Sequence, residues 1–315
     1  MLSPDDRWIW DFWHVQDDDG LHHLYYLQAP RSLGDPELRH RNATVGHATS
    51  RDLVDWQELG TVLEPGQPGS PDATATWTGS VVRGDDGRWR MFYTGSTFLT
   101  PDSHANIEVV ALATSDDLHT WVKDESVVLT ADARWYERLG DSSWPEEAWR
   151  DPWVHRDATG WRMLLTARSA TGAVDDRGVV GSATSPDLRD WTIGPPLSTS
   201  GAGFAHVEVL QSVVLDGRRF LVFSANRAVL TAERRERGGA TGTWIAPWDD
   251  EIDLARAVNL TGPALYSGRV IETTGGPVLL AFRLSDDGEE FVGGICDPLP
   301  IRVTGERVEL APGDR

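Results

Sequence analysis

Apolar and aromatic residues gather in five runs along the chain, and each run begins at or directly after a glycine. The runs are LHHLYYLQA (21–29), GRWRMFYTG (87–95), GWRMLLTAR (160–168), GRRFLVFSA (217–225) and GPVLLAFRL (276–284). Unbroken apolar runs of this length, bounded by turn residues, indicate buried β-strands.

A second strand-like segment lies directly before each run. The segments are WIWDFWHVQD (8–17), TWTGSVVRGD (76–85), AWRDPWVHRD (148–157), HVEVLQSVVLDG (206–217) and ALYSGRVIETTG (264–275). Most of these pairs are joined by Asp-Gly or Asp-x-Gly, which is turn chemistry typical of tight hairpins. We therefore expect five antiparallel hairpins spread evenly along the sequence.

A motif that reads A-T-S-x-D-L-x-x-W occurs three times, as GHATSRDLVDW (46–56), ALATSDDLHTW (111–121) and GSATSPDLRDW (181–191). Ser and Asp side chains bond to nearby backbone amides in turns. The motif therefore predicts a strand that ends in a Ser/Asp turn, followed by a Trp that opens the next strand. Recurrence of such a unit is typical of a repeat architecture.

The repeating unit is a strand, a tight turn, a strand, a longer link, a third strand, a turn and a fourth strand. Four-stranded sheets repeated around an axis make a β-propeller. We predict an all-β fold, a five-bladed β-propeller of four-stranded antiparallel blades with a central active-site pocket. Residues 1–315 are expected to form a single domain without a C-terminal β-sandwich, and 232–242 is the best candidate for a short helix or polar loop.

Composition narrows the function classes. The chain is 40% hydrophobic and 25% charged, which is typical of a soluble globular protein. Its net charge of −20 argues against nucleic acid or an anionic membrane as a partner, because both attract cationic surfaces. Without a recognisable secretion signal or a long apolar segment, cytoplasmic residence is the expectation.

Cofactor and metal chemistry find little support in the sequence. Cys296 is the only cysteine, which excludes an intrachain disulfide and a cysteine-based zinc site. His22 and His23 share a predicted strand but have no further ligand at metal spacing, so we expect no metal and no cofactor. Fifteen Trp residues suit both strand packing and stacking against a flat sugar ring.

Three carboxylates fall at one level of the predicted propeller, whose first strands line the central channel. Asp151 and Glu208 each stand twelve residues before an equivalent position in the following strand. Asp11 stands thirteen before it, and a turn one residue longer brings it to the same level. Gly79 and Tyr266 occupy this level in the other two blades, so the alignment predicts that three acids share one pocket.

Like charges that face one another repel, and each pays a desolvation cost, so such a cluster suggests catalysis. Glycoside hydrolysis uses an ionised carboxylate and a protonated one on either side of the scissile bond. Each acid also has a structural alternative. Asp11 or Asp151 as a turn cap, and Glu208 as an ion-pair partner of Arg150, remain open, although the shared level favours catalysis.

Three segments resemble glycoside hydrolase family 32, whose members are five-bladed β-fructofuranosidases. They are VGHATSRDLVDWQELGTVLEP (45–65), WTGSVVRGDDGRWRMFYTGS (77–96) and WRDPWVHRD (149–157). The segment WDFW (10–13) is more similar to the W-D-x-W nucleophile motif of family 68, the levansucrases and inulosucrases. Family 43, which includes arabinofuranosidases and xylosidases, shares the propeller and the three acids but resembles these segments less.

The resemblance implies a role for each matching residue. Asp11 matches the nucleophile, Asp151 the acid that stabilises the transition state, and Glu208 the general acid/base. It also implies that Arg150 contacts sugar hydroxyls beside Asp151, and that Trp77 and Thr78 line the sugar pocket.

Four further residues are candidates for substrate binding. His206 lies two positions before Glu208, so on a strand both side chains share a face. Gln28 is a candidate for bonds to sugar hydroxyls. Trp10 and Trp13 stand where family 32 usually has the Asn-Asp-Pro-Asn-Gly neighbours of its nucleophile, and we expect them to shape the pocket.

Three hypotheses follow, all with a small carbohydrate as the ligand. The first is a retaining β-fructosidase or fructosyltransferase with Asp11 as nucleophile and Glu208 as acid/base. The second is an inverting, family 43-like furanosidase or xylosidase in which Asp11 activates water. The third is a sugar-binding propeller without turnover.

Overall fold

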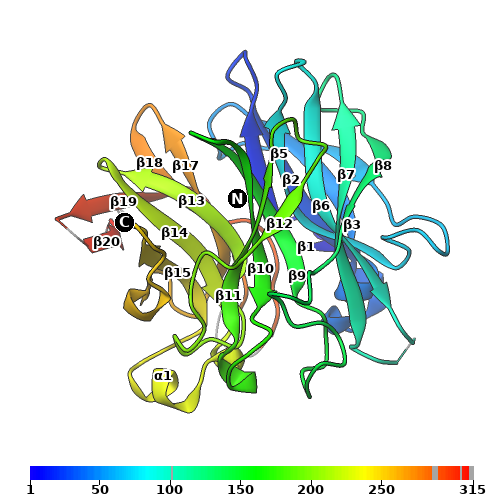
Figure 1. The fold of residues 1–315 in the computed structure, drawn as a ribbon. Helices are drawn as coiled ribbons and strands as arrows, with labels where there is room; N and C mark the ends of the chain where they lie inside the picture. Colours follow the sequence, from blue (N-terminus) through cyan, green and yellow to red (C-terminus); the bar gives the residue numbers. More distant parts are fainter. Residues whose placement is uncertain (101, 286–289, 306, 312–315) are drawn as a thin grey trace.

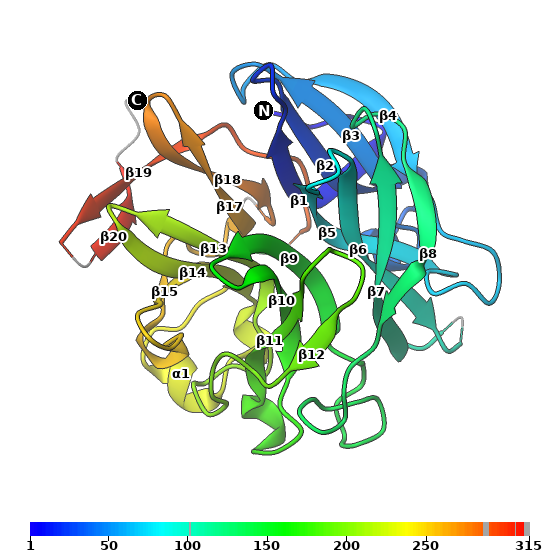
Figure 2. The same cartoon turned by 45° about the horizontal axis from the view of Figure 1, so that its top comes forward.

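The computed structural model describes residues 1–100, 102–285, 290–305 and 307–311, in which twenty strands form five four-stranded antiparallel sheets (Figure 1). The sheets are arranged as blades around a central axis (Figure 2). The predicted five-bladed β-propeller is therefore confirmed.

Each blade follows chain order from its innermost strand to its outer edge. Blade 1 contains β1 (Arg7–Gln16), β2 (His22–Pro30), β3 (Thr44–Ser50) and β4 (Gln57–Leu63). Blade 2 contains β5 (Ala75–Arg83), β6 (Trp89–Phe98), β7 (Asn106–Ser115) and β8 (Val122–Leu129). Blade 3 contains β9 (Trp149–Asp157), β10 (Gly160–Arg168), β11 (Gly178–Ser185) and β12 (Thr192–Gly194).

Blade 4 contains β13 (Glu208–Leu215), β14 (Arg218–Ala225), β15 (Gly242–Pro247) and β16 (Val258–Asn259). Blade 5 contains β17 (Leu265–Thr273), β18 (Gly276–Arg283), β19 (Leu299–Thr304) and β20 (Arg307–Leu310). The helix α1 (Ala232–Glu236) falls inside the predicted helix or loop. Short 3₁₀ helices occupy Arg31–Leu33, Pro36–Arg41, Val174–Asp176, Arg227–Val229 and Leu254–Arg256.

The innermost strands β1, β5, β9, β13 and β17 contact one another in sequence, and β17 contacts β1 to complete the ring. The segment after β18 closes the junction between blades 5 and 1. Leu2 and Ile295 exchange backbone hydrogen bonds of 3.1 and 2.8 Å, and the amide of Gly294 donates to the Ile9 carbonyl of β1 at 2.8 Å. Backbone bonds therefore join the two ends of the ring.

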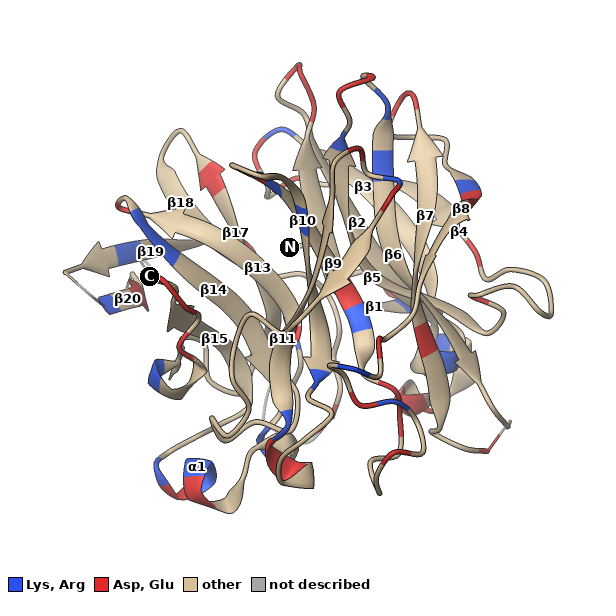
Figure 3. Cartoon of the chain, viewed as in Figure 1, with Lys and Arg blue, Asp and Glu red and all other residues tan. Residues whose placement is uncertain are grey.

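Buried apolar side chains lie between neighbouring blades. One cluster contains Phe92 of blade 2 and Val154 of blade 3, and another contains Leu164 of blade 3 and Phe223 of blade 4. Both faces of a blade are therefore covered, which explains why the strand sequences are unbroken apolar runs. Charged residues lie mainly in the loops and turns that join the strands (Figure 3). Within the described ranges, no helix is long and apolar enough to cross a membrane.

The A-T-S-x-D-L-x-x-W motif forms the turn between the third and fourth strands of blades 1 to 3. In blade 3, Ser185 Oγ accepts from the amides of Asp187 and Leu188 at 3.2 and 2.9 Å. Asp187 Oδ1 accepts from the next two amides, both at 2.9 Å. Leu188 adopts a φ of +65°, which is rare for a bulky residue, and is 1% exposed. Burial of the leucine therefore accompanies a strained turn that the Ser and Asp side chains hold in place.

Each innermost strand pairs with the second strand through a one-residue shift in register, a β-bulge, at the same end of the blade. Asp11, Thr78 and Asp151 lie in the bulges of β1, β5 and β9, whereas Glu208 lies one residue before the bulge of β13. The predicted common level was therefore wrong by one residue. Equal spacing along the sequence does not reveal which residue of a bulge is the unpaired one.

The Ser/Asp turn gives a stability prediction. Replacing Ser185 by Ala removes two hydrogen bonds to amides that close the turn, and we expect the free energy of unfolding to fall by about 1–2 kcal/mol. Urea unfolding followed by Trp fluorescence measures the change. Ser32→Ala, at an exposed serine, serves as the control. Equal stability of the two variants would show that the motif does not stabilise the turn.

Candidate active site

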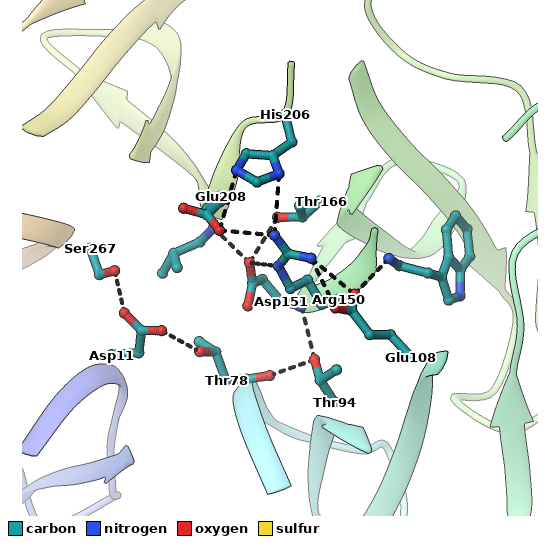
Figure 4. Close-up of polar contacts among 12 residues, drawn as sticks. Asp11, Thr78, Thr94, Glu108, Arg150, Asp151, Thr166, His206, Glu208 and Ser267 are labelled. Carbon is teal, nitrogen blue, oxygen red and sulfur yellow. Dashed lines mark hydrogen bonds and ion pairs between the residues drawn. The ribbon is translucent and has the colours of Figure 1, made fainter. Parts of the chain in front are cut away.

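Asp11, Asp151 and Glu208 line one cavity of about 280 Å³ at the bulged ends of the innermost strands. The three carboxylates come from β1, β9 and β13, so they meet only in the folded protein (Figure 4). The alignment thus predicted the shared pocket, although not the level of each side chain.

Asp11 is held by hydroxyl groups from two other blades. Ser267 of β17 donates its hydroxyl to Asp11 Oδ1, and Thr78 of β5 donates to Oδ2 at 3.2 Å. Burial and the charge of Asp151 together raise the pKa of Asp11 to about 7, against the opposing effect of the bonds from Ser267 and Thr78. The Asp11 carboxyl therefore titrates close to neutral pH.

Asp151 also has a structural role. Its Oδ2 accepts from Thr166 Oγ1 at 2.8 Å and from the backbone amide of Val209 at 3.0 Å, while its own amide donates to Thr94 Oγ1 at 2.9 Å. The φ of Asp151 is +56°, a strained value for a residue with a side chain. Bonds to blades 2 and 4 thus hold Asp151 in a conformation that it would rarely adopt alone.

Glu208 is surrounded by hydrogen-bond donors. Arg150 Nη2 donates to Oε1 at 2.9 Å, the Tyr266 hydroxyl donates to Oε2 at 2.5 Å, and His206 Nε2 lies 3.6 Å from Oε1. Burial raises the pKa of Glu208, but His206, Arg150 and Tyr266 outweigh burial and lower it to about 2. In the free site Glu208 is therefore a carboxylate, and the alternative of an ion pair with Arg150 is also realised.

Arg150 connects the acids of this region (Figure 4). Its Nη1 donates to both oxygens of Glu108, at 2.9 and 3.1 Å, and Nη2 also donates to Glu146 at 3.2 Å. Its Nε lies 3.9 Å from Asp151 Oδ2. Glu108 is 0% exposed and Arg150 is also buried, so each charge needs the other as its counter-charge. One guanidinium thus compensates several carboxylates that repel one another.

The structure brings most of the predicted binding residues to the cavity. Trp10, Trp77, Thr78, Arg150 and His206 all line it. Trp77 donates its indole N–H to the carbonyl of His40 at 2.8 Å, which fixes the ring at the wall.

Among the described residues that line the cavity, Trp13 and Gln28 are absent, because both side chains pack elsewhere in blade 1. Trp13 is fully buried and stacks on Tyr25 with ring centroids 6.1 Å apart. Gln28 donates to Thr61 Oγ1 at 2.8 Å, between strands of blade 1. The bulge at Asp11 changes which residues of β1 face the axis, and simple alternation does not predict that change.

Several lining residues escaped the sequence analysis. Tyr266 stands at the predicted level of the acids, but a tyrosine at that position does not by itself indicate a site residue. Glu146 comes from residues 130–148, the link between blades 2 and 3, and His40 and Asn226 come from links outside the innermost strands. Their sequence neighbours contain no pattern that separates them from ordinary loop residues.

A wider groove of about 990 Å³ continues from the cavity and shares Trp10, Asp11, Glu208 and Tyr266 with it. Aromatic residues Trp8, Phe282 and Phe291 line its far side, together with Arg39. The Arg39 guanidinium lies 3.9 Å from the centroid of the Phe291 ring. The site therefore has a narrow inner part that contains the acids and a broad, amphipathic entrance.

The histidines of blade 1 contact one another away from this cavity. His14 Nε2 lies 2.8 Å from His22 Nδ1, and His23 Nδ1 lies 3.0 Å from His47 Nε2. Among the described residues, no group of three His, Cys, Asp or Glu side chains has a metal-binding arrangement.

The ion pairs of Arg150 give a second stability prediction. Replacing Arg150 by Met leaves Glu108 buried without its counter-charge, and we expect the free energy of unfolding to fall by about 3–5 kcal/mol. Adding Glu108→Gln to this variant should recover part of the loss, because the buried charge is then removed as well. Denaturant unfolding of the four proteins of this double-mutant cycle measures the coupling. Additive losses would contradict direct compensation.

The geometry can be compared with known proteins. Residues 2–256 match the family model described as Glycosyl hydrolases family 32 N-terminal domain. The Arabidopsis thaliana protein named Beta-fructofuranosidase, insoluble isoenzyme CWINV6, is 28% identical over 235 residues, covering 72% of this chain and 39% of that protein. The Sucrose-6-phosphate hydrolase of Escherichia coli is 31% identical over 186 residues, covering 57% of this chain and 34% of that protein. The aligned regions thus span less than two fifths of either relative.

Solved structures share the fold. The inulosucrase from Halalkalicoccus jeotgali bound to kestose has a TM-score of 0.78 and 22% identity, covering 98% of this chain and 87% of the other. At this identity the likeness establishes the propeller alone. The family model matches well over half of the chain, and the protein therefore belongs to glycosyl hydrolases family 32.

Proposed function

We propose that this protein is a glycoside hydrolase that acts on β-fructofuranosides, such as sucrose or short fructans, with retention of configuration. One observation carries the proposal. Asp11, Asp151 and Glu208, from three separate blades, line one cavity in a chain of family 32. The curated relatives named as β-fructofuranosidases and sucrose-6-phosphate hydrolases support the substrate class.

Asp11 is the proposed nucleophile and Glu208 the proposed acid/base. An Asp11 oxygen attacks the anomeric carbon of the fructosyl unit while Glu208 donates its proton to the leaving glycosidic oxygen. The products of this step are a fructosyl–Asp11 ester and the released alcohol. Water then attacks the same carbon, Glu208 takes a proton from that water, and the Asp11 carboxylate leaves.

Asp151 and Arg150 hold the sugar in this scheme. Asp151 Oδ2 is already engaged by Thr166 and Val209, which leaves Oδ1 to accept hydrogen bonds from ring hydroxyls. A fixed acceptor that strengthens its bonds as positive charge develops on the sugar lowers the barrier. The inner cavity accepts the furanose ring, and the groove accepts the leaving sugar.

The scheme needs an ionised Asp11 and a protonated Glu208, but in the free site the proton is on Asp11 and Glu208 is ionised. Asp11 has the higher pKa, about 7, and Glu208 the lower, about 2. Arg150 and Tyr266 are the groups that a bound sugar can draw away from Glu208, because both line the cavity. Losing these donors raises the pKa of Glu208, so substrate binding moves the shared proton toward the acid that must donate it.

Substrate turnover and its stereochemistry test the proposal. We expect the wild-type protein to release fructose from sucrose or short fructans and, with methanol present, to form methyl β-fructofuranoside, since the ester intermediate transfers to alcohols with retention. Asp11→Asn and Glu208→Gln should each lower kcat by at least about 10³-fold. Asp72→Asn, at a buried aspartate outside the cavity, is the matched control.

Chromatography of the products measures turnover, and NMR measures the anomeric configuration of the methyl fructoside. Formation of the α-glycoside would indicate inversion. Near wild-type turnover by the Asp11 and Glu208 variants would exclude both residues from catalysis. Sugar binding without any product would support a binding protein instead.

The proton distribution predicts a pH profile. Between about pH 2 and 7 the Asp11–Glu208 pair holds one proton, and above 7 Asp11 loses it, so no proton remains for the leaving group. We expect kcat/KM to fall as the pH rises through about 7. Ser267→Ala should move this alkaline limb to higher pH. The Ser267 bond lowers the pKa of Asp11 in the wild type, so removing that bond raises the pKa.

The pH dependence of kcat/KM, with stability followed at each pH, checks the prediction. An alkaline limb that is unchanged or moves to lower pH in Ser267→Ala would show that Asp11 does not set it.

A further inference from the structure

Blade 5 supplies none of the three carboxylates, yet its innermost strand contacts two of them. On β17, the Tyr266 hydroxyl donates to Glu208 and the Ser267 hydroxyl donates to Asp11. The backbone of this strand is itself anchored to blade 4, because the Ser267 amide donates to Ser224 Oγ at 2.8 Å. Thus β17 lies between the two acids and touches both.

Arg269 follows the bulge of β17 and reaches the strands of both acids. Its Nε donates to the carbonyl of Phe12, the residue after Asp11, at 3.3 Å. Its Nη1 donates to the carbonyl of Leu210 and, at 3.4 Å, to that of Val209, the residue after Glu208. One planar guanidinium therefore links blades 1, 4 and 5 at the axis.

The position of this cation is unusual. Arg269 is 1% exposed, its guanidinium lies 5.1 Å from the centroid of the Trp153 ring, and its Nη2 has no hydrogen-bond partner among the described residues. Burial lowers the pKa of Arg269 to about 10, while the charges of Asp151 and Asp11 oppose that change. The side chain therefore remains cationic at neutral pH, and its charge acts on Asp151 and Asp11.

We propose that Arg269 is a positioning residue of the active site, which fixes the distance between Asp11 and Glu208 by tying together the backbone segments that follow them. The inference rests on the proposed function, since it concerns the separation of the proposed nucleophile and acid/base. Retaining glycosidases hold these carboxyls about 5–5.5 Å apart, and inverting ones about 6.5–9.5 Å. A small relaxation of either strand therefore lowers the rate, and a shift of about 1 Å can cost about 10²-fold.

Two substitutions at Arg269 separate position from charge. Arg269→Met removes the charge and all three backbone bonds but keeps an unbranched apolar chain. Arg269→Lys keeps the charge but lacks the planar fork that serves two strands at once. Arg234→Met is the matched control, because Arg234 donates to the carbonyls of Ala202, Ala255 and Ala257 outside the catalytic cavity.

We expect Arg269→Met to lower kcat by about 10²-fold with a change in KM of less than about threefold, measured below its melting temperature. The alkaline limb of kcat/KM should move to higher pH, because a cation near Asp11 and Asp151 is lost. Arg269→Lys should restore the position of the limb and only part of kcat. Arg234→Met should have a lower melting temperature but the kcat and pH profile of the wild type.

The outcomes distinguish the two proposals. An active wild type with an Arg269→Met variant of unchanged kcat and pH profile would leave Arg269 a purely structural residue and the proposed function intact. A wild type that does not release or transfer fructose would overturn the proposed function and this inference with it.

Discussion

The compensation of buried carboxylates by Arg150 is the interaction on which the site depends. Glu108, Glu146 and Glu208 all bond to its guanidinium, and Asp151 lies beside it. Burying Glu108 and Asp151, which are 0% and 3% exposed, without a cation would cost several kcal/mol for each. That cost is a large part of the stability of an ordinary domain. The Arg next to Asp151 therefore has a structural reason to be there that is independent of any contact with a sugar.

The bulges explain how five similar strands place different side chains at the axis. Each innermost strand pairs regularly up to one extra residue, and there Asp11, Thr78 and Asp151 leave the ladder. Asp151, Val209 and Ser267 adopt positive φ values of 56°, 54° and 50° in the last three blades. Amide bonds from each of these residues to the blade before it hold the strain in place. Blade-to-blade packing thus determines the site geometry.

The fold could be predicted from the sequence because all five blades repeat a pair of apolar strands and three of them also repeat the Ser/Asp turn motif. Apolar runs gave the strands, and the Ser/Asp/Leu turn gave the period. The same regularity identified Asp11, Asp151 and Glu208 as residues of one pocket. It failed for Trp13 and Gln28, because the orientation of a side chain near a bulge depends on one unpaired residue that no propensity marks.

Residues such as Glu146, His40 and Tyr266 reach the cavity from loops or from a blade without an acid. Their positions follow from tertiary packing, which a local pattern does not contain. Arg269 belongs to the same class, since its bonds go to carbonyls distant in sequence. The Phe12 carbonyl on β1 is 257 residues away, and the Leu210 carbonyl on β13 is 59 residues away.

The proton distribution of the free site links these points to function. Donors from Arg150, His206 and Tyr266 keep Glu208 ionised, whereas burial and the charge of Asp151 keep the pKa of Asp11 high. In the proposed mechanism this resting arrangement is unreactive, and a sugar makes it reactive by competing for the same donors. The contacts that the sugar takes over are those that keep Glu208 ionised. Binding energy is therefore used to protonate Glu208, the state that the transition state requires. The rigid ring of strands is what allows the exchange, since the carboxylates can change partners without changing places.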